Sequence, residues 1–237
     1  MSSSEKRRKI DELMEKASDA LRRTAYFEAE RLSMRALGMA RQLADFERIH
    51  RIVMPLQESR RQRLQLAFDS PEPVQIVHEP FSEQTKFRPG CYLVVPPLVG
   101  ADARRLRLKL LSDEVPAAVL CAEPLTGTGL LPIVAIGNTT IRTKIRPPKV
   151  LDTPDIEWFA AAMEALGDWA ISMADPALSG TKLLDTYLDM LDSHPDHENL
   201  HLALLEVARD LAHSTDPGEE PGSSTSTTAT SGPRAGA

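Results

Sequence analysis

Long apolar runs are missing from this sequence: no stretch of about eighteen apolar residues occurs, so we expect no membrane-spanning helix. The first residues are basic but no apolar core follows them, which argues against a secretory signal. Cysteine is scarce, and both cysteines, Cys91 and Cys121, fall within predicted strands. We therefore expect both cysteines to be free and buried, and to have no redox or metal-binding role. These features predict a cytoplasmic protein without membrane contact.

Common enzyme and nucleotide-binding motifs are absent as well. The sequence holds no G-x-G-x-x-G or G-K-[ST] phosphate loop, no G-x-S-x-G motif and no cysteine set near a histidine. Aromatic residues make up only 5% of the chain and do not interleave with its basic clusters, so a stacking platform for nucleic acid is missing. Nothing in the pattern demands an enzyme, and a nucleic-acid partner is not expected.

Charge is distributed unevenly along the 237 residues. The net charge of −6 divides into +5 over residues 1–66, +2 over 67–150 and −13 over 151–237. A basic front and an acidic back can steer self-association or the binding of an acidic partner. Solvated helix faces of different sign give the same pattern, and we favour that interpretation. The length fits one compact domain with appendages or two small domains.

The strand signal is concentrated between residues 89 and 149. Three apolar runs, the first of them β-branched, and one alternating run lie there between turn-forming residues, and one helical segment separates the first two. The dipeptide Gly137-Asn138 between the last two runs predicts a two-residue hairpin. We therefore expect a small mixed sheet of about four strands with one crossover helix, Ala103–Leu111. The strand runs are Cys91–Val95, Ala117–Ala122, Pro132–Ile136 and Thr139–Ile145.

Helical periodicity dominates the residues before this segment. Residues 1–68 carry three amphipathic stripes, which predict a helical domain. Pro55 lies within the third stripe and predicts a kink or the junction of two shorter helices. Residues 69–88 are rich in proline and predict a linker with one short strand, Val74–Val77.

The residues after the sheet predict further helices, over 150–213, that pack on it. The first follows Asp152-Thr153-Pro154 and is apolar on two faces, so we expect it to be sandwiched between the sheet and other helices. Trp169 belongs to one of those faces. Residues 214–237 are rich in Ser, Thr, Gly and Pro and predict a disordered tail. The expected fold class is thus mixed α/β with helical ends.

Two helical hairpins resemble the tetratricopeptide repeat. Small and large apolar residues of the first hairpin fall at the packing positions of that family, namely Leu13, Ala17, Ala20, Tyr26, Ala29, Ala36 and Leu37. The second hairpin has similar spacing, with Leu183, Tyr187, Leu191, Pro195, Leu200 and Ala203. The first departs from the family at Thr24, where glycine is common, and no proline closes it. The resemblance implies a groove that binds a helix or an extended segment of a protein partner.

The residues His197-Glu198-Asn199-Leu200-His201 match the motif H-E-x-x-H. Two histidines four residues apart share a helix face and can bind one zinc ion, with the glutamate as general base. This resembles the zincin metalloproteases and would make His197 and His201 ligands and Glu198 the base. Pro195 marks a helix start where that family has a helix interior, and no histidine follows at the spacing of the extended motif. Zinc therefore remains an alternative to a protein without a cofactor.

Two groups of basic residues predict a site for an anion or a partner. The first group lies in the loop and first turn that open the central helix, where anions are attracted. The second alternates along the last strand and so faces one side of the sheet. A connecting turn and a solvated strand face explain the same residues, and we favour these explanations. The candidates are Gly100, Arg104 and Arg105 in the first group, and Arg142, Lys144 and Arg146 in the second.

The pattern as a whole favours a non-enzymatic protein–protein interaction or scaffolding protein that uses helical-repeat-like surfaces. Fewer than three repeats do not form a stable solenoid alone, so self-association is a corollary. A zinc-dependent hydrolase and an anion- or nucleotide-binding α/β module are the alternatives.

Overall fold

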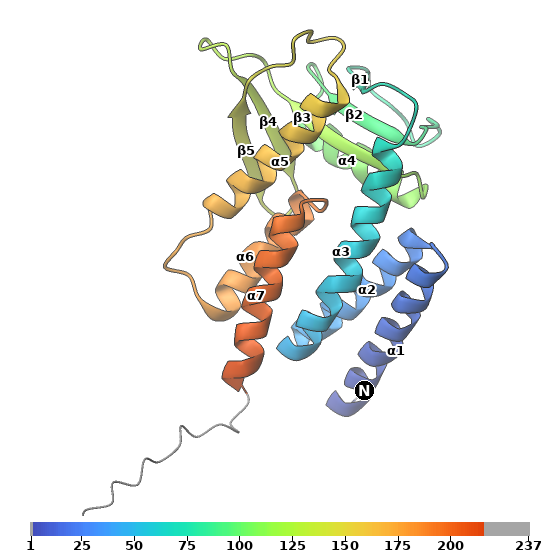
Figure 1. Cartoon of the computed structure of the whole chain (residues 1–237), viewed down its shortest axis with the longest axis vertical. Helices are drawn as coiled ribbons and strands as arrows, with labels where there is room; N and C mark the ends of the chain where they lie inside the picture. Colours follow the sequence, from blue (N-terminus) through green and yellow to red (C-terminus); the bar gives the residue numbers. More distant parts are fainter. Residues whose placement is uncertain (1, 216–237) are drawn as a thin grey trace, which may run out of the picture.

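A computed structural model describes residues 2–215, which form seven helices and five strands (Figure 1). Helices come first, a sheet follows, and helices close the described chain, so the predicted mixed α/β class is confirmed. The predicted disordered tail lies outside the described residues except for Ser214 and Thr215. These two residues end the last helix and correct the predicted boundary.

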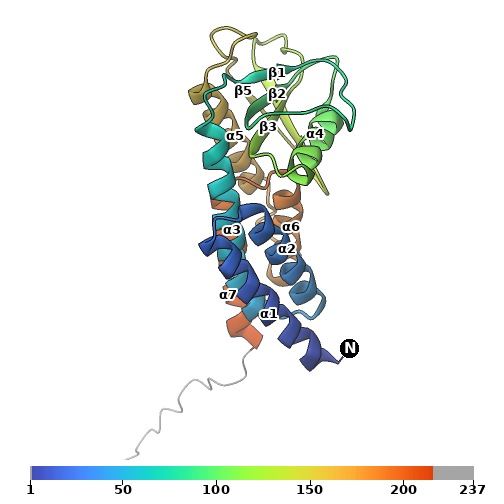
Figure 2. The same cartoon turned by 90° about the vertical axis from the view of Figure 1, so that its right-hand side faces the viewer.

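Helices from the two ends of the chain form one array. Helices α1 (Ser3–Arg22), α2 (Tyr26–Gln42) and α3 (Phe46–Phe68) follow one another through short turns. Helix α7 (Glu198–Thr215) packs against α3, and α6 (Gly180–Ser193) packs against α7. Helix α3 therefore joins the two repeat-like hairpins, α1–α2 and α6–α7, although more than a hundred residues separate them (Figures 1 and 2).

Both apolar packing and ion pairs hold this array together. A single cluster of buried apolar side chains extends from Ile10 of α1 to Ala208 of α7. The guanidinium of Arg41 on α2 donates two hydrogen bonds of 2.5 Å to the carboxylate of Asp185 on α6. Bidentate pairs of this kind fix geometry as well as adding energy, so the lower ends of α2 and α6 are tied together.

Pro55 lies inside α3 without interrupting it, since the helix runs from Phe46 to Phe68. A proline in a helix interior removes one backbone hydrogen bond, and its ring crowds the preceding turn. The apolar face of α3, including Ile52, Val53 and Leu56, is fully buried around this point. Tertiary packing on both sides of the proline keeps the helix continuous, so the predicted junction of two helices is absent from α3.

The sheet has five strands in the order β1-β2-β3-β4-β5, rather than about four. Strands β1 (Gln75–Val77), β2 (Gly90–Val94) and β3 (Ala117–Ala122) are parallel to one another. Strands β4 (Leu131–Ile136) and β5 (Thr140–Ile145) continue the sheet in antiparallel fashion. The fifth strand, β1, is the short strand predicted at Val74–Val77 within the proline-rich segment, and the structure adds that it pairs with β2 and so belongs to the sheet.

The connections within the sheet follow the predicted outline. Helix α4 (Gly100–Ser112) links β2 to β3 and forms the expected crossover. The β4–β5 hairpin has three residues between its paired ends, Ile136 and Thr140, rather than the two predicted. A Cβ atom at Gly137 would come within 2.6 Å of the backbone of Ser193, so the lack of a side chain there lets the hairpin fit against the end of α6.

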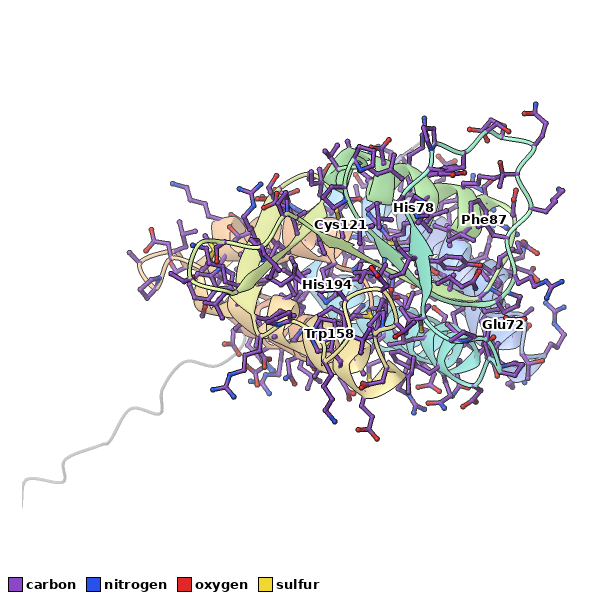
Figure 3. All side chains as sticks on the ribbon, turned by 90° about the horizontal axis from the view of Figure 1, so that it is seen from above. Glu72, His78, Phe87, Cys121, Trp158 and His194 are labelled. Atoms are coloured by element: carbon purple, nitrogen blue, oxygen red, sulfur yellow. The ribbon has the colours of Figure 1, made fainter. Side chains whose placement is uncertain are left out.

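The sheet is covered on both faces. Helix α4 packs on one face, and helices α3 and α5 (Ile156–Ser172) pack on the other. Seen from above, α4 and α5 lie on opposite sides of the strands, with Trp158 of α5 on the side away from α4 (Figure 3). All of β2 is buried, as expected for a parallel strand with helices packed on both faces of its sheet.

Helix α5 is sandwiched between the sheet and the first turns of α7, as its two apolar faces predicted. Phe159 and Leu166 are fully buried. Trp169 departs from the prediction, because 45% of its surface is exposed. Within residues 2–215, no helix combines the length and apolarity needed to cross a membrane.

Candidate functional site

A large hollow lies among α2, α4 and the end of α6. Its volume is about 540 Å³. We call it the α2–α4 cleft. Figure 2 shows these three helices on the same side of the molecule, with α4 above α2 and α6. Clefts of this volume are typical of sites that take up a small molecule or a few side chains.

Apolar side chains form the walls of the cleft. Phe27 and Met34 come from α2, Leu108 and Leu111 from α4, and Leu191 from α6. Met34 and Leu108 remain 42% and 45% exposed, although both helices have other faces that are fully buried. Large apolar side chains that line a hollow and stay in contact with water favour an occupant that covers them.

Buried charges form the floor of the cleft. Arg60 of α3 donates from Nε to Glu30 at 2.8 Å, and Arg63 forms a second ion pair of 2.8 Å with the same carboxylate. Arg63 also lies over the ring of Phe27, 5.2 Å from its centroid. The two guanidinium groups hold the pKa of Glu30 below its ordinary value despite the opposing effect of burial. Glu30 is thus a buried carboxylate shared by two arginines.

Arg107 of α4 completes the floor. Its Nη2 donates to the backbone carbonyl of Asp192 at 2.6 Å. Burial lowers the pKa of Arg107, and the neighbouring Arg60 and Arg104 lower it further, while Asp192 and Asp196 act in the opposite sense. The carboxylate of Asp192 accepts a hydrogen bond from Asn138 N–H and lies 3.6 Å from Arg104.

A second, shallower hollow of about 460 Å³ adjoins the first on the other side of α4. Leu108 and Ser112 line both hollows, so the exposed Leu108 forms a ridge between them. Arg104, Arg105 and Lys109 line the second hollow together with Glu83. Each of the three cations pairs with an aspartate, namely Asp192, Asp102 and Asp113. The surface of α4 therefore presents an apolar ridge beside a row of ion pairs.

The predicted anion site around Gly100 does not form an open cradle. A Cβ at Gly100 would lie 2.6 Å from Ile136, so that side chain covers the glycine. The start of α4 is already capped, because Val99 N–H donates to the carboxylate of Asp102 at 3.0 Å. Arg105 stacks on Phe81, 4.4 Å from its ring centroid, rather than facing Gly100. Arg104 and Arg105 instead belong to the surface beside the cleft.

The basic strip on the last strand lies apart from these residues. Arg142, Lys144 and Arg146 are all exposed, as the predicted alternation required. Arg142 pairs with Glu123 at 2.8 Å, so its charge is already matched. The strip fits a solvated strand face.

The two histidines of the H-E-x-x-H match point to different partners. His197 precedes α7 and caps it, because its Nδ1 accepts the N–H of Leu200 at 3.3 Å. His201 lies within the helix; its Nδ1 donates to the carbonyl of His197 at 2.9 Å, and its Nε2 accepts from Arg60 at 3.2 Å. Glu198 is exposed. The i, i+4 rule holds only inside a helix, so this arrangement does not bring both imidazoles to one ion.

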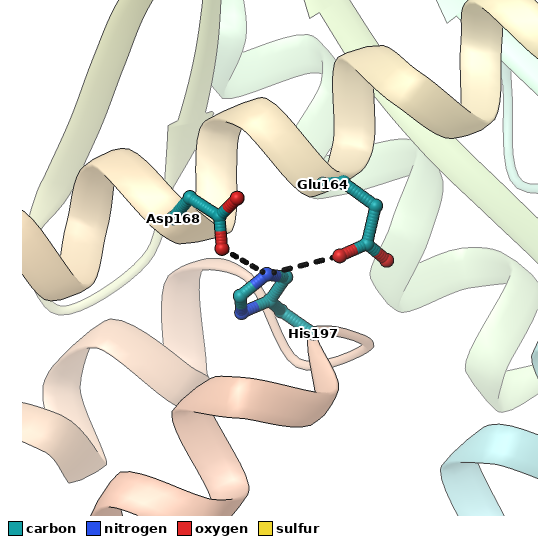
Figure 4. Close-up of side chains that lie close together, drawn as sticks. All are labelled: Glu164, Asp168 and His197. Carbon is teal, nitrogen blue, oxygen red and sulfur yellow. Dashed lines mark ion pairs between the residues drawn. The ribbon is translucent and has the colours of Figure 1, made fainter.

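His197 meets two carboxylates of α5 instead (Figure 4). Its Nε2 lies 3.2 Å from Glu164 and 3.3 Å from Asp168. The three donor groups are close enough to surround a metal ion. However, a metal-binding imidazole donates its other N–H to an acceptor, whereas Nδ1 of His197 accepts one. Nε2 therefore carries the hydrogen and lies within ion-pair distance of both carboxylates without forming a hydrogen bond to either. With Nδ1 as the acceptor, the residues do not fit a zinc site.

Two further histidines of this region are held neutral. Burial lowers the pKa of His194 to about 3, and that of His201 to about 3. His194 Nε2 donates to the carbonyl of Met163 at 2.9 Å. In both cases nearby cations or histidines reinforce the effect of burial. These rings act as neutral packing and hydrogen-bonding groups rather than as acids at neutral pH.

The two cysteines are free and buried, as predicted. Burial raises the pKa of Cys91 and of Cys121 to about 12. Neither thiol is activated as a nucleophile.

We compared the chain with protein-family models, curated proteins and solved structures, and none of them matches it.

The α2–α4 cleft was not anticipated from the sequence. Its residues come from four helices, and Glu30, Arg60 and Arg107 share no local spacing. One signal was available: Arg104 and Arg105 of the predicted crossover helix were candidate site residues, and they line the hollow beside the cleft. Without the packing of α2 beside that helix, the cleft itself could not be predicted.

Proposed function

We propose that this chain is a non-enzymatic protein–protein interaction protein that binds a segment of a partner in the α2–α4 cleft. The observation that carries the proposal is the cleft of about 540 Å³ with apolar walls and a charged floor. Covering Met34 and Leu108 removes apolar surface from water, which contributes roughly 25 cal/mol for each Å². A few large side chains anchored in such a pocket typically supply most of the binding energy of an interface.

The charge around the cleft supports an acidic partner segment. Six basic side chains and four carboxylates line the cleft and the hollow beside it, which leaves an excess of positive charge. Positive potential of this kind speeds the encounter with negatively charged partners and selects among them. The resemblance of the neighbouring hairpins to tetratricopeptide repeats agrees with a segment-binding role.

The test compares one variant in the cleft with one matched control. Leu108 on α4 and Leu202 on α7 have similar exposed fractions, 45% and 43%, and only Leu108 lines the cleft. With a purified partner, Leu108→Glu is expected to weaken binding about tenfold or more, while Leu202→Glu leaves the dissociation constant unchanged. Equal affinity of both variants and the unmodified chain would contradict the proposal.

A second copy of this chain is the other occupant to test. Light scattering during gel filtration over a range of concentrations gives the mass in solution. A dimer that Leu108→Glu dissociates and Leu202→Glu does not would identify the partner as the chain itself. A monomer at all concentrations would leave a different protein as the partner.

A further inference from the structure

The floor of the cleft carries donors that are poorly matched by their acceptors. Arg60 directs Nε to Glu30 and Nη1 to His201, but its Nη2 donates to the thioether sulfur of Met34 at 3.4 Å. A thioether is a weak acceptor. Arg107 lines the same cleft and directs Nη2 to a backbone carbonyl rather than to a carboxylate. Two guanidinium groups thus face the cleft with hydrogen-bonding capacity that a carboxylate would use better.

The charged groups around these two arginines do not balance. Three carboxylates serve the four guanidinium groups of this region, and each carboxylate has other contacts. Glu30 is shared by Arg60 and Arg63, and Asp196 lies 3.6 Å from Arg63. Burial raises the pKa of Asp196, which weakens it further as a counter-charge. The remaining carboxylate is Asp192 and the remaining guanidinium groups are Arg104 and Arg107. One positive charge is left in excess.

We propose that Arg60 and Arg107 form a carboxylate-binding site in the floor of the α2–α4 cleft, which takes an Asp or Glu side chain of the partner segment. This inference rests on the proposed function and specifies the chemistry of the partner. Charge-assisted hydrogen bonds to guanidinium are about twice as strong as neutral ones. Both arginines are already desolvated in the unbound protein, so an incoming carboxylate meets preorganised donors in a site with little water.

The shape of the surface favours a side chain within a segment over the end of a chain. The cleft continues across Leu108 into the second hollow, because the two share Leu108 and Ser112. A segment lying across this ridge places one apolar side chain against Met34 and Leu108 and an acidic side chain over the arginines. The exposed Arg31–Glu114 ion pair of 3.4 Å joins α2 to the end of α4 at the margin of the cleft.

The test uses two small probes of the same shape, 3-phenylpropionate and its primary amide. Binding is followed by NMR through the methyl group of Met34 and the Nε–H groups of Arg60 and Arg107. The acid is expected to bind about tenfold more tightly than the amide, since only the acid supplies a charged acceptor. In Arg107→Met this preference is expected to fall to about twofold, because the charged acid loses more affinity than the amide.

Arg107 is the residue to replace because Arg60 is held by Glu30 and His201, and its loss would disturb the core. The comparison of the two probes on the unmodified chain needs no variant. Equal binding of acid and amide would overturn the carboxylate site and leave the apolar cleft in place. The carboxylate site would also be overturned if the NMR signals of Arg60 and Arg107 did not respond to millimolar acid. Failure of the proposed function is a separate result, in which Leu108→Glu leaves the affinity for the partner unchanged.

Discussion

The imidazole of His197 occupies the space that a side chain at position 167 would need, because Gly167 of α5 lies directly beneath its ring. Glu164 and Asp168 flank this glycine on the same helix and face His197 Nε2. The absence of a side chain at residue 167 therefore sets how closely α5 approaches the start of α7. This contact joins the sheet and its helices to the helical array.

Gly167→Ala is expected to lower the free energy of unfolding by about 1–3 kcal/mol, since the added methyl group would overlap the His197 ring. Gly38→Ala is the control, because a Cβ at Gly38 of α2 meets nothing within 4 Å. That substitution is expected to stabilise by about 0.5–1 kcal/mol through helix propensity. Urea unfolding of both variants checks the prediction, and a neutral Gly167→Ala would contradict the packing described here.

Stability is expected to fall as the pH drops below about 6.5, because His201 is neutral in the folded state. Its folded pKa of about 3 lies below the unfolded value, so the unfolded chain binds more protons between these two values. The stability that comes from keeping His201 neutral is fully present above its unfolded-state pKa. Below that pKa, the free energy of unfolding falls by about 1.4 kcal/mol for each pH unit. His194 has a similarly lowered pKa, so it adds the same dependence of the free energy of unfolding on pH.

His201→Gln isolates one of these two contributions. Glutamine can donate to the carbonyl of His197 and accept from Arg60, and it does not titrate. The difference in unfolding free energy between the variant and the unmodified chain should therefore change with pH over this range. A difference that stays constant from pH 7 to pH 5 would show that His201 does not titrate as described.

The tautomer of His197 distinguishes a structural contact from a metal site. We expect Nε2 to carry the hydrogen and Nδ1 to be unprotonated, because Nδ1 accepts the N–H of Leu200. Long-range proton–nitrogen NMR spectra report this directly. Thermal melts with added zinc and with a chelator are expected to coincide. The opposite tautomer, together with a melting temperature raised by stoichiometric zinc, would restore the zinc alternative with Glu164 and Asp168 as co-ligands.

The turn between α1 and α2 holds Thr24 in the left-handed region, with φ of 58°. This conformation is unfavourable for β-branched residues and explains why glycine is common at the matching repeat position. Thr24→Gly is expected to raise the free energy of unfolding by about 0.5–1 kcal/mol. Thr24→Ala, which keeps a Cβ, should gain less in the same urea titration. A loss of stability in Thr24→Gly would contradict the inferred strain.

The elements with a strong local pattern could be predicted from the sequence. Ala117–Ala122 was predicted with its observed bounds, because a short apolar run between turn signals needs no tertiary information. Strand β1 has only three residues, and its pairing with β2 decides its place in the sheet. Trp169 fits an apolar helix face, but whether a neighbour covers it depends on the path of α6 and α7.

The functional features depended more on tertiary structure. The H-E-x-x-H match is real in sequence, yet His197 is the helix cap, so its ring and that of His201 diverge. The α2–α4 cleft arises because α2, α3 and α4 meet, and no spacing along the chain indicates that Arg60 and Arg107 are neighbours. Basic residues on the central helix could be recognised as a candidate site, but their apolar ridge at Leu108 could not.

The measurement that tests the central claim most directly is site-specific photo-crosslinking from inside the cleft. A photoreactive phenylalanine analogue replaces Leu108 in one chain and the equally exposed Leu202 in another, in cells that naturally produce the protein. We predict a defined adduct from position 108 whose partner contributes an acidic segment, and no such adduct from position 202. Equal labelling from both positions, or a defined adduct from position 202 alone, would contradict the assignment of the α2–α4 cleft as the binding site.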